Sequence, residues 1–203
     1  MDFNAQTLME QAANMFNQSD WKLLKDESET NVAILESKQF KNYVLPHYRI
    51  RATINLPISD LVNLVWDTTM ISAKVDDPSI VEFRVIEETE DYKIRRQVNQ
   101  PNLPFVWPRE TVFIQHKYVE DNGDVWLIGY SVDHADCPIN DKEVVRTKMT
   151  MSVYRYIAIT ENRTLVQRVA NIDPRGSIPL VAIKATATRA LNAFNNWASR
   201  VQE

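Results

Sequence analysis

The sequence predicts an α+β fold in which a curved antiparallel sheet wraps around one long helix near the C-terminal end. Six segments between residues 81 and 172 have the length of strands and are rich in β-branched and aromatic residues. Turns separate these segments, as in an antiparallel meander. The last apolar segment instead repeats its apolar residues at helical spacing. A sheet curved around a helix encloses space, so we expect an internal hydrophobic cavity.

The first third of the chain predicts two further helices and a group of strands. Residues 1–18 repeat apolar side chains at helical spacing, and residues 21–56 alternate in patches that predict two or three strands. Pro57 then precedes a helical apolar stripe, which predicts a short helix. We find no sign of a linker or repeat and therefore expect a single domain over residues 1–203.

The predicted C-terminal helix, residues 179–202, has an unusual apolar face. Pro179 suits its first turn, where a missing N–H costs nothing. Small side chains under a wide sheet leave volume unfilled, so either the sheet closes down on them or a ligand fills the gap. The face combines five alanines with larger residues toward its end: Ala182, Ala185, Ala187, Ala190, Ala193, Leu191, Phe194 and Trp197.

The composition excludes several classes of function. Lys and Arg number 23 against 27 Asp and Glu, and this net charge of -4 gives no electrostatic reason to bind nucleic acid. With three glycines, neither a dinucleotide fingerprint nor a phosphate loop is present. The three histidines are far apart and the one cysteine has no CxxC partner, so we expect neither a metal nor a cofactor.

The same features predict a cytoplasmic protein. The single Cys137 cannot form an intramolecular disulfide. The first residues lack both the basic and the apolar region of a signal peptide, and no run of eighteen apolar residues suggests a spanning helix.

Catalytic arrangements are weak in this sequence. There is no G-x-S-x-G motif, and Cys137 lies beside Asp136 and His134 in a predicted loop where no base is oriented. The acidic run at residues 87–91 is typical of a solvated turn. We therefore expect no enzyme activity.

Strand alternation gives candidate inward residues, because successive side chains point to opposite faces. In residues 92–98 the apolar face contains Arg96, which either contacts a carboxylate, water or a polar ligand group, or reaches solvent by its long stem. The following strands place bulky, adaptable side chains inward, and these either contact a ligand or form an ordinary core. They are Trp126, Ile128, Tyr130, Met149 and Met151.

Four motifs in order give the chain a resemblance to a known family. These are DWKLL after the first helix, WPRETVFIQ, the passage from Pro138 to Arg146, and IDPRGSIP before the last helix. Together they resemble the START lipid-transfer domains, which are related to the steroidogenic acute regulatory protein, over residues 21–201. The resemblance implies a helix-grip fold with a hydrophobic tunnel for one sterol, phospholipid or similar molecule. It also implies a C-terminal helix that acts as a lid.

The resemblance implies a set of cavity-lining positions in this chain, of which two depart from the family pattern. Sterol-binding members have an acid and a base at the positions of Arg96 and Gln115, so that pair is absent here. The phosphate-gripping arginine of phosphatidylcholine carriers falls near Ser72, although Asp76 aligns with its acidic neighbour. Neither ligand class is therefore predicted, and we hypothesise that Arg96 contacts an anionic head group. The implied positions are Arg96, Gln115, Ile128, Met149, Ala187, Ala190 and Phe194.

The sequence thus predicts a monomer that binds one lipid, contacts membranes transiently and transfers the lipid between them. Two alternatives stay open: a lipid-sensing or protein-interaction module that keeps its ligand, and an enzyme that acts on a hydrophobic substrate. The predicted ligand-binding residues are Arg96, Gln115, Trp126, Ile128, Tyr130, Met149, Met151, Ala187, Ala190, Leu191 and Phe194.

Overall fold

The computed structural model describes residues 3–27, 33–101, 106–140, 142–176, 178 and 180–199. The elements, in chain order, are α1 (Phe3–Phe16), β1 (Lys22–Asp26), β2 (Ala33–Lys38), β3 (His47–Ile54), α2 (Ile58–Trp66), α3 (Met70–Asp76), β4 (Ile80–Glu88), β5 (Tyr92–Asn99), β6 (Arg109–Val119), β7 (Val125–Ser131), β8 (Val145–Arg146), β9 (Lys148–Thr160), β10 (Arg163–Asp173) and α4 (Leu180–Ser199).

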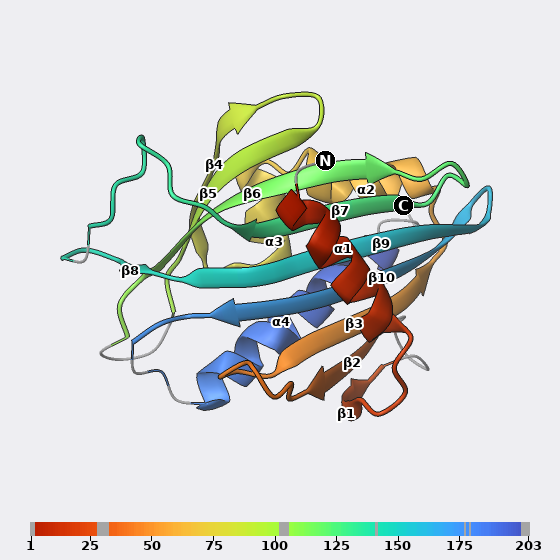
Figure 1. The fold of residues 1–203 in the computed structure, drawn as a ribbon, viewed down its shortest axis with the longest axis horizontal. Coiled ribbons are helices and arrows are strands. Elements are labelled where there is room, and N and C mark those ends of the chain that lie inside the picture. Colours follow the sequence, from red (N-terminus) through yellow and green to blue (C-terminus); the bar gives the residue numbers. More distant parts are fainter. Residues whose placement is uncertain are drawn as a thin grey trace.

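One curved sheet contains all the described strands. Its order is β1-β2-β3-β10-β9-β7-β6-β5-β4, and β8 adds a short parallel pairing to β6. The pairings along the main path are antiparallel. The sheet curves around α4, whereas α1 crosses its opposite face (Figure 1). The predicted helix-grip fold is therefore confirmed.

Two separate apolar clusters hold the helices against the sheet. On the inner face, Leu127 and Tyr156 pack with Leu191 and Phe194 of α4. On the outer face, a second cluster of β7, β9 and β10 side chains packs against α1 around Phe16. Each face of the sheet is thus buried by its own helix, and each strand between them carries apolar residues on both sides.

The helix boundaries agree with the sequence pattern in part. The short helix after Pro57 is present as α2, and its apolar stripe is buried at Leu61, Val62 and Trp66. The seven-residue α3 was not predicted. It begins at a capping box in which Thr69 and Ser72 satisfy each other's backbone N–H groups.

Candidate functional site: a cavity under the C-terminal helix

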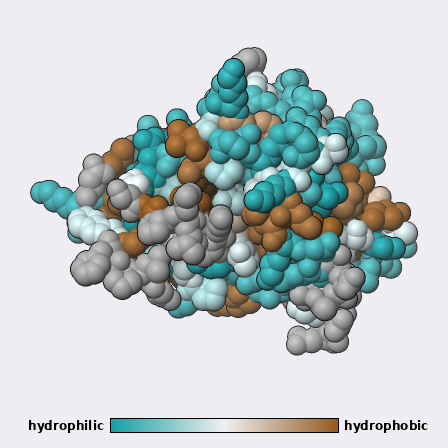
Figure 2. Space-filling model, turned by 90° about the horizontal axis from the view of Figure 1, so that it is seen from below, coloured by the Kyte–Doolittle hydropathy of each residue, from teal (hydrophilic) through white to brown (hydrophobic). Residues whose placement is uncertain are grey.

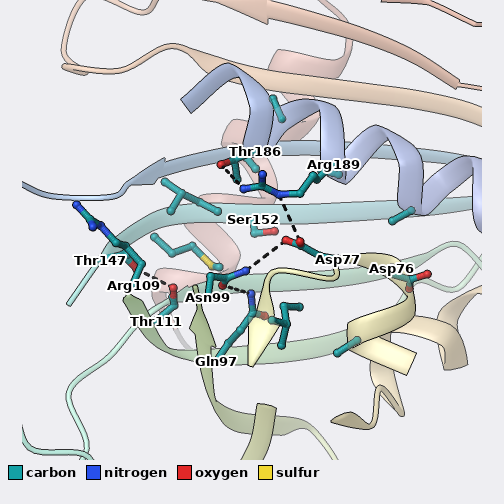
Figure 3. Close-up of a pocket in the computed structure, with 18 of the residues that line it drawn as sticks. Asp76, Asp77, Gln97, Asn99, Arg109, Thr111, Thr147, Ser152, Thr186 and Arg189 are labelled. Carbon is teal, nitrogen blue, oxygen red and sulfur yellow. Dashed lines mark hydrogen bonds and ion pairs between the residues drawn. The ribbon is translucent and has the colours of Figure 1, made fainter. Parts of the chain in front are cut away.

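A cavity of about 580 Å³ lies between the inner face of the sheet and helices α2, α3 and α4. Its volume is within the range of roughly 300–1,000 Å³ that is typical of small-molecule sites. Apolar residues form the larger share of its wall, and polar groups gather at a few places (Figure 3). The cavity can therefore hold one small amphiphilic molecule.

Helix α4 contributes small side chains to the cavity wall. Ala187, Ala190 and Ala193 follow one another at helical spacing and line the cavity, followed by Trp197. The prediction that a small-residue face lies under the sheet is correct for these positions. The side chains of Ala182 and Ala185 lie outside the described residues.

Four predicted ligand-binding residues line the cavity: Gln115, Met149, Ala187 and Ala190. Leu191 and Phe194 are fully buried on α4 and pack into the inner core instead of lining the cavity. They anchor α4, because the Phe194 ring stacks on Tyr154 of β9 at a centroid distance of 6.3 Å.

The predicted inward orientation of Trp126, Ile128, Tyr130 and Met151 is wrong. Trp126, Ile128 and Met151 are buried in the outer cluster that contains α1, and Tyr130 packs against that cluster. The physical reason is that both faces of the sheet are covered, so apolar alternation could not distinguish the inner face from the outer one.

An irregularity in β9 brings Met149 and Ser152 to the same cavity although they are three residues apart. The register with β10 shifts so that Ile172 lies opposite Met149 and Asn171 opposite Met151. Thr150 is the extra residue of this β-bulge. The inward side therefore changes from odd to even positions along β9, which strict alternation could not predict.

The predicted inward face of β5 is also wrong, and this moves Arg96 away from the cavity. Arg96 lies on the outer side, where its guanidinium forms ion pairs with Glu82 and Glu110. Of the alternatives for Arg96, the carboxylate partner is present, but it is not inside the cavity. The residues of β5 that line the cavity are Arg95, Gln97 and Asn99.

Arg95 is the buried arginine that sequence reasoning missed. Its side chain is 2% exposed and donates to the carbonyl oxygens of Val65, at 3.0 Å, and of Trp66, at the end of α2. It also donates to Gln115 Oε1, so Arg95 rather than Arg96 pairs with Gln115. Burial lowers the pKa of Arg95 to about 10, against the raising influence of Asp67, and Arg95 therefore remains charged at neutral pH. A cation at the C-terminal end of a helix is favourably placed.

Polar contacts fasten α4 to α3 and the segment after it. Trp197 Nε1 donates to Asp76 Oδ2 at 2.9 Å. Arg189 Nε lies 3.3 Å from Asp77 Oδ1, and Asn99 donates to Asp77 Oδ2 at 3.3 Å (Figure 3). The contacts of Trp197 and Arg189 tie α4 to Asp76 and Asp77, so α4 cannot move away from α3 without breaking them.

The fold and the cavity define a class of proteins in which a sheet grips a C-terminal helix around one enclosed site. Comparison with protein families then identifies the family: the START domain model matches residues 4–203, and the chain belongs to the START domain family. No curated protein sequence matches the chain. None of the helices in the described part of the chain is long and apolar enough to cross a membrane.

Solved structures of the same fold include proteins described as lipid transfer proteins and an aromatase/cyclase. Human StAR-related lipid transfer protein 5 superposes with a TM-score of 0.82 at 14% identity, covering 98% of this chain and 96% of that one. Human STARD10 gives 0.75 at 16% identity, covering 100% and 89%. The Zhui aromatase/cyclase of a Streptomyces species gives 0.50 at 14% identity, covering 77% and 95%. At these identities the likeness shows the fold alone.

Proposed function

We propose that this protein binds a single lipid, a phospholipid, sterol or related molecule, in the cavity under α4 and transfers it between membranes as a monomer. The observation that carries the proposal is the mainly apolar cavity whose roof is the small-residue face of α4. Membership of the START domain family supports it.

The free energy of binding comes from apolar burial. At about 25 cal/mol per Å², a ligand that hides roughly 400 Å² of apolar surface gains about 10 kcal/mol before the costs of association are subtracted. This gain opposes the free energy that the lipid loses on leaving a membrane. Transfer therefore needs no chemical step, but the cavity must open for the lipid to enter and leave.

Helix α4 is the element that opens in this proposal. It is fastened by a small number of polar contacts and by packing at its C-terminal half, around Phe194 and Trp197. A terminal helix fastened in this way can open locally without unfolding the sheet.

Transient membrane contact is supported by the distribution of exposed apolar residues. Three loops expose large hydrophobic side chains, at Val44 (94% exposed), Trp107 (50%) and Ile139 (58%). Figure 2 shows hydrophobic residues in separate patches among hydrophilic ones. Small separate patches suit brief contact better than permanent anchoring.

Native mass spectrometry of the purified protein, followed by a vesicle-to-vesicle transfer assay, tests the proposal. We expect the mass of one lipid bound per chain and a transfer rate well above the spontaneous rate. A bound lipid that stays on the protein would instead support a sensing module, and a mass change of that lipid on incubation would support an enzyme.

A crosslink tests the role of α4 in the same assay. Asn195 on α4 contacts Glu27 beside β1 at 2.6 Å. In a Cys137→Ser background, Glu27→Cys with Asn195→Cys, joined by a short bismaleimide, should stop transfer without unfolding the protein. Each single-cysteine variant treated with the same reagent is the control, and undiminished transfer by the crosslinked protein would contradict the opening of α4.

A further inference from the structure

The cavity wall carries more positive than negative charge. Among the described lining residues there are four arginines and two aspartates, a formal excess of two positive charges. The aspartates, Asp76 and Asp77, are both engaged by α4, through Trp197 and Arg189.

Two of the cavity arginines fasten the protein's own backbone. Arg95 donates to the carbonyl oxygens of Val65 and Trp66 at the end of α2. Arg109 donates to the carbonyl oxygens of Trp107, Pro174 and Arg175, and joins the loops before β6 and after β10. Arg189 faces Asp77, as described above. Structural roles thus account for three of the four arginines.

Arg168 differs from the others. It lies on β10, and its Nε and Nη2 both point to one neutral acceptor, Ser152 Oγ, at 3.3 and 3.1 Å. Its guanidinium carbon lies 5.0 Å from the centre of the Tyr154 ring. Within the described part of the chain, no carboxylate lies at ion-pair distance from it. A half-buried guanidinium with several N–H groups and no counter-charge is an unfavourable arrangement unless an anion or water completes it.

Arg168 shares the cavity wall with two further polar side chains, Ser152 and Gln115. Ser152 lies opposite Gly129 on β7, and Gly129 lies opposite Gln115 on β6, so the three positions form one row across the sheet. Gly129 in the middle of that row has no side chain, and the Met149 side chain lies against it. A Cβ there would lie 3.6 Å from the Met149 Sδ atom, which itself lines the cavity.

Gln115 completes the row as a donor. Its Oε1 accepts a hydrogen bond from Arg95, which fixes the orientation of the amide. The amide nitrogen has no protein acceptor among the described residues. The cavity wall therefore offers N–H groups from Arg168, beside Ser152, and from Gln115 two strands away.

We propose that Arg168, with Ser152 and Gln115, forms a subsite for an oxyanion, a carboxylate or a phosphate, at the polar end of the lipid. The inference rests on the proposed lipid binding and specifies the class of lipid. The same cavity has apolar wall residues for the rest of the ligand, among them Ile172, Ile178 and Ile183. A guanidinium matches the geometry of carboxylate and phosphate groups, which explains why an arginine occupies the position.

A competition between matched lipids tests the proposal. Delipidated protein is incubated with vesicles that contain equal amounts of oleate and oleyl alcohol, which share one chain and differ in the charge of the polar end. Native mass spectrometry then measures the ratio of the two in the recovered protein. We expect oleate to dominate by about tenfold or more, since hydrogen bonds to charged groups contribute that much. A parallel mixture of lysophosphatidate and monoolein measures the preference for phosphate.

The variants separate the subsite from the rest of the cavity. Arg168→Gln should lower the oleate to oleyl alcohol ratio about tenfold, and Arg168→Lys should lower it less, because it keeps the charge but loses the planar guanidinium. Arg163→Gln is the matched control, since Arg163 is an exposed arginine on the same strand.

Three results would overturn the inference. The unmodified protein could prefer both neutral lipids; the ratio could be unchanged in a folded Arg168→Gln variant; or Arg163→Gln could lower it equally. Recovery of protein with neither member of either pair would instead contradict lipid binding itself. The preference of the unmodified protein remains a test even if Arg168→Gln does not fold.

Discussion

The hydrogen bond between Trp197 and Asp76 gives a direct test of whether the opening of α4 limits lipid transfer. The indole Nε1 donates to Asp76 Oδ2 at 2.9 Å, and Trp197 is 3% exposed. Its ring also stacks on Phe194 at a centroid distance of 4.7 Å. Trp197→Phe removes the donor and keeps an aromatic ring on this stack.

The structure sets the size of the expected effect. A hydrogen bond to a charged acceptor contributes about 1.5–3 kcal/mol. Asp76 is partly exposed and has a further interaction of its own, so the lower end of this range applies. A loss of about 1.4 kcal/mol raises the population of the open state about tenfold. We therefore expect Trp197→Phe to speed both transfer and amide exchange in α4 about tenfold.

The ion pair between Arg189 and Asp77 should have a smaller effect. The two side chains are 35% and 20% exposed, the contact is 3.3 Å, and Arg189 Nε makes no hydrogen bond to a described residue. A partly exposed ion pair contributes about 0.2–1 kcal/mol, so Arg189→Gln should change either rate by no more than about fivefold. Ser199→Ala is the control on the same helix, since Ser199 Oγ contacts only α4 carbonyl oxygens among the described residues.

Two measurements separate the steps of this reasoning. Dequenching of a fluorescent lipid reports transfer, and hydrogen exchange with mass spectrometry reports the opening of α4. Faster exchange in Trp197→Phe without faster transfer would show that opening of α4 does not limit transfer. Unchanged exchange would show that this hydrogen bond does not hold the helix closed.

Three further predictions concern the sheet and its two faces. Glu36→Gln should lower the free energy of unfolding by about 3–5 kcal/mol, measured by urea denaturation, because it leaves the buried Arg49 without its 2.8 Å carboxylate partner. The ring of His47 is buried between aromatic rings without a hydrogen-bond partner for either nitrogen among the described residues, and burial lowers its pKa from 6.5 to about 4. The unfolded chain then binds a proton that the folded chain excludes, so stability should fall by on the order of 2–3 kcal/mol as the pH drops from 6.5 to about 4, and His47→Phe should remove that loss. Gly129→Leu should push Met149 further into the cavity and reduce lipid occupancy in native mass spectrometry, at a stability cost of about 1–3 kcal/mol, because even a Cβ there meets Ser152 O at 3.3 Å and Met149 Sδ at 3.6 Å.

Each of these predictions has a control and a result that would contradict it. Glu82→Gln removes a carboxylate that is 43% exposed, and an equal loss in both variants would refute the importance of burial. His134→Gln should leave the acid-dependent loss of stability in place. If this variant instead removed the loss, His134 rather than His47 would be its cause. A folded Gly129→Leu protein with full lipid occupancy would contradict the role of the wall around Met149 in lipid binding.

The arrangement of elements was predictable because it follows from periodicity, whereas the face that each strand turns to the cavity was not. The lengths and apolar patterns of β4 to β10 and of α4 indicated a sheet around a helix. Ala187 and Ala190 were found because small residues on an apolar helical face are themselves a signal. The prediction that Trp126 and Ile128 point toward the cavity failed because α1 covers the outer face of the sheet. In a strand that is buried on both sides, both faces are apolar, and the sequence does not distinguish the inner face from the outer one.

The polar residues of the site were missed for a related reason. Lys93, Arg95 and Gln97 have the composition of a solvent-exposed face, and Arg96 between them follows the apolar side. In the structure Arg95 lies on the inner face, where it donates to carbonyl oxygens at the end of α2 that have no partner within the helix. The end of α2 thus explains why the charged Arg95 lies on the inner face. The sequence does not show that α2 ends beside this strand.

The bulge at Thr150 explains how one sheet can bury both faces and still enclose a polar subsite. Without the extra residue, strict alternation from Met149 would turn Met151 and Val153 toward the cavity and Ser152 toward α1. The apolar side chains that now pack under α1 would fill the cavity, and Arg168 would lose its hydroxyl partner. Because of the bulge, the Met151 side chain packs in the outer cluster and the Ser152 side chain lines the cavity. A single irregular residue in β9 thus separates the side chains that pack under α1 from those that line the cavity.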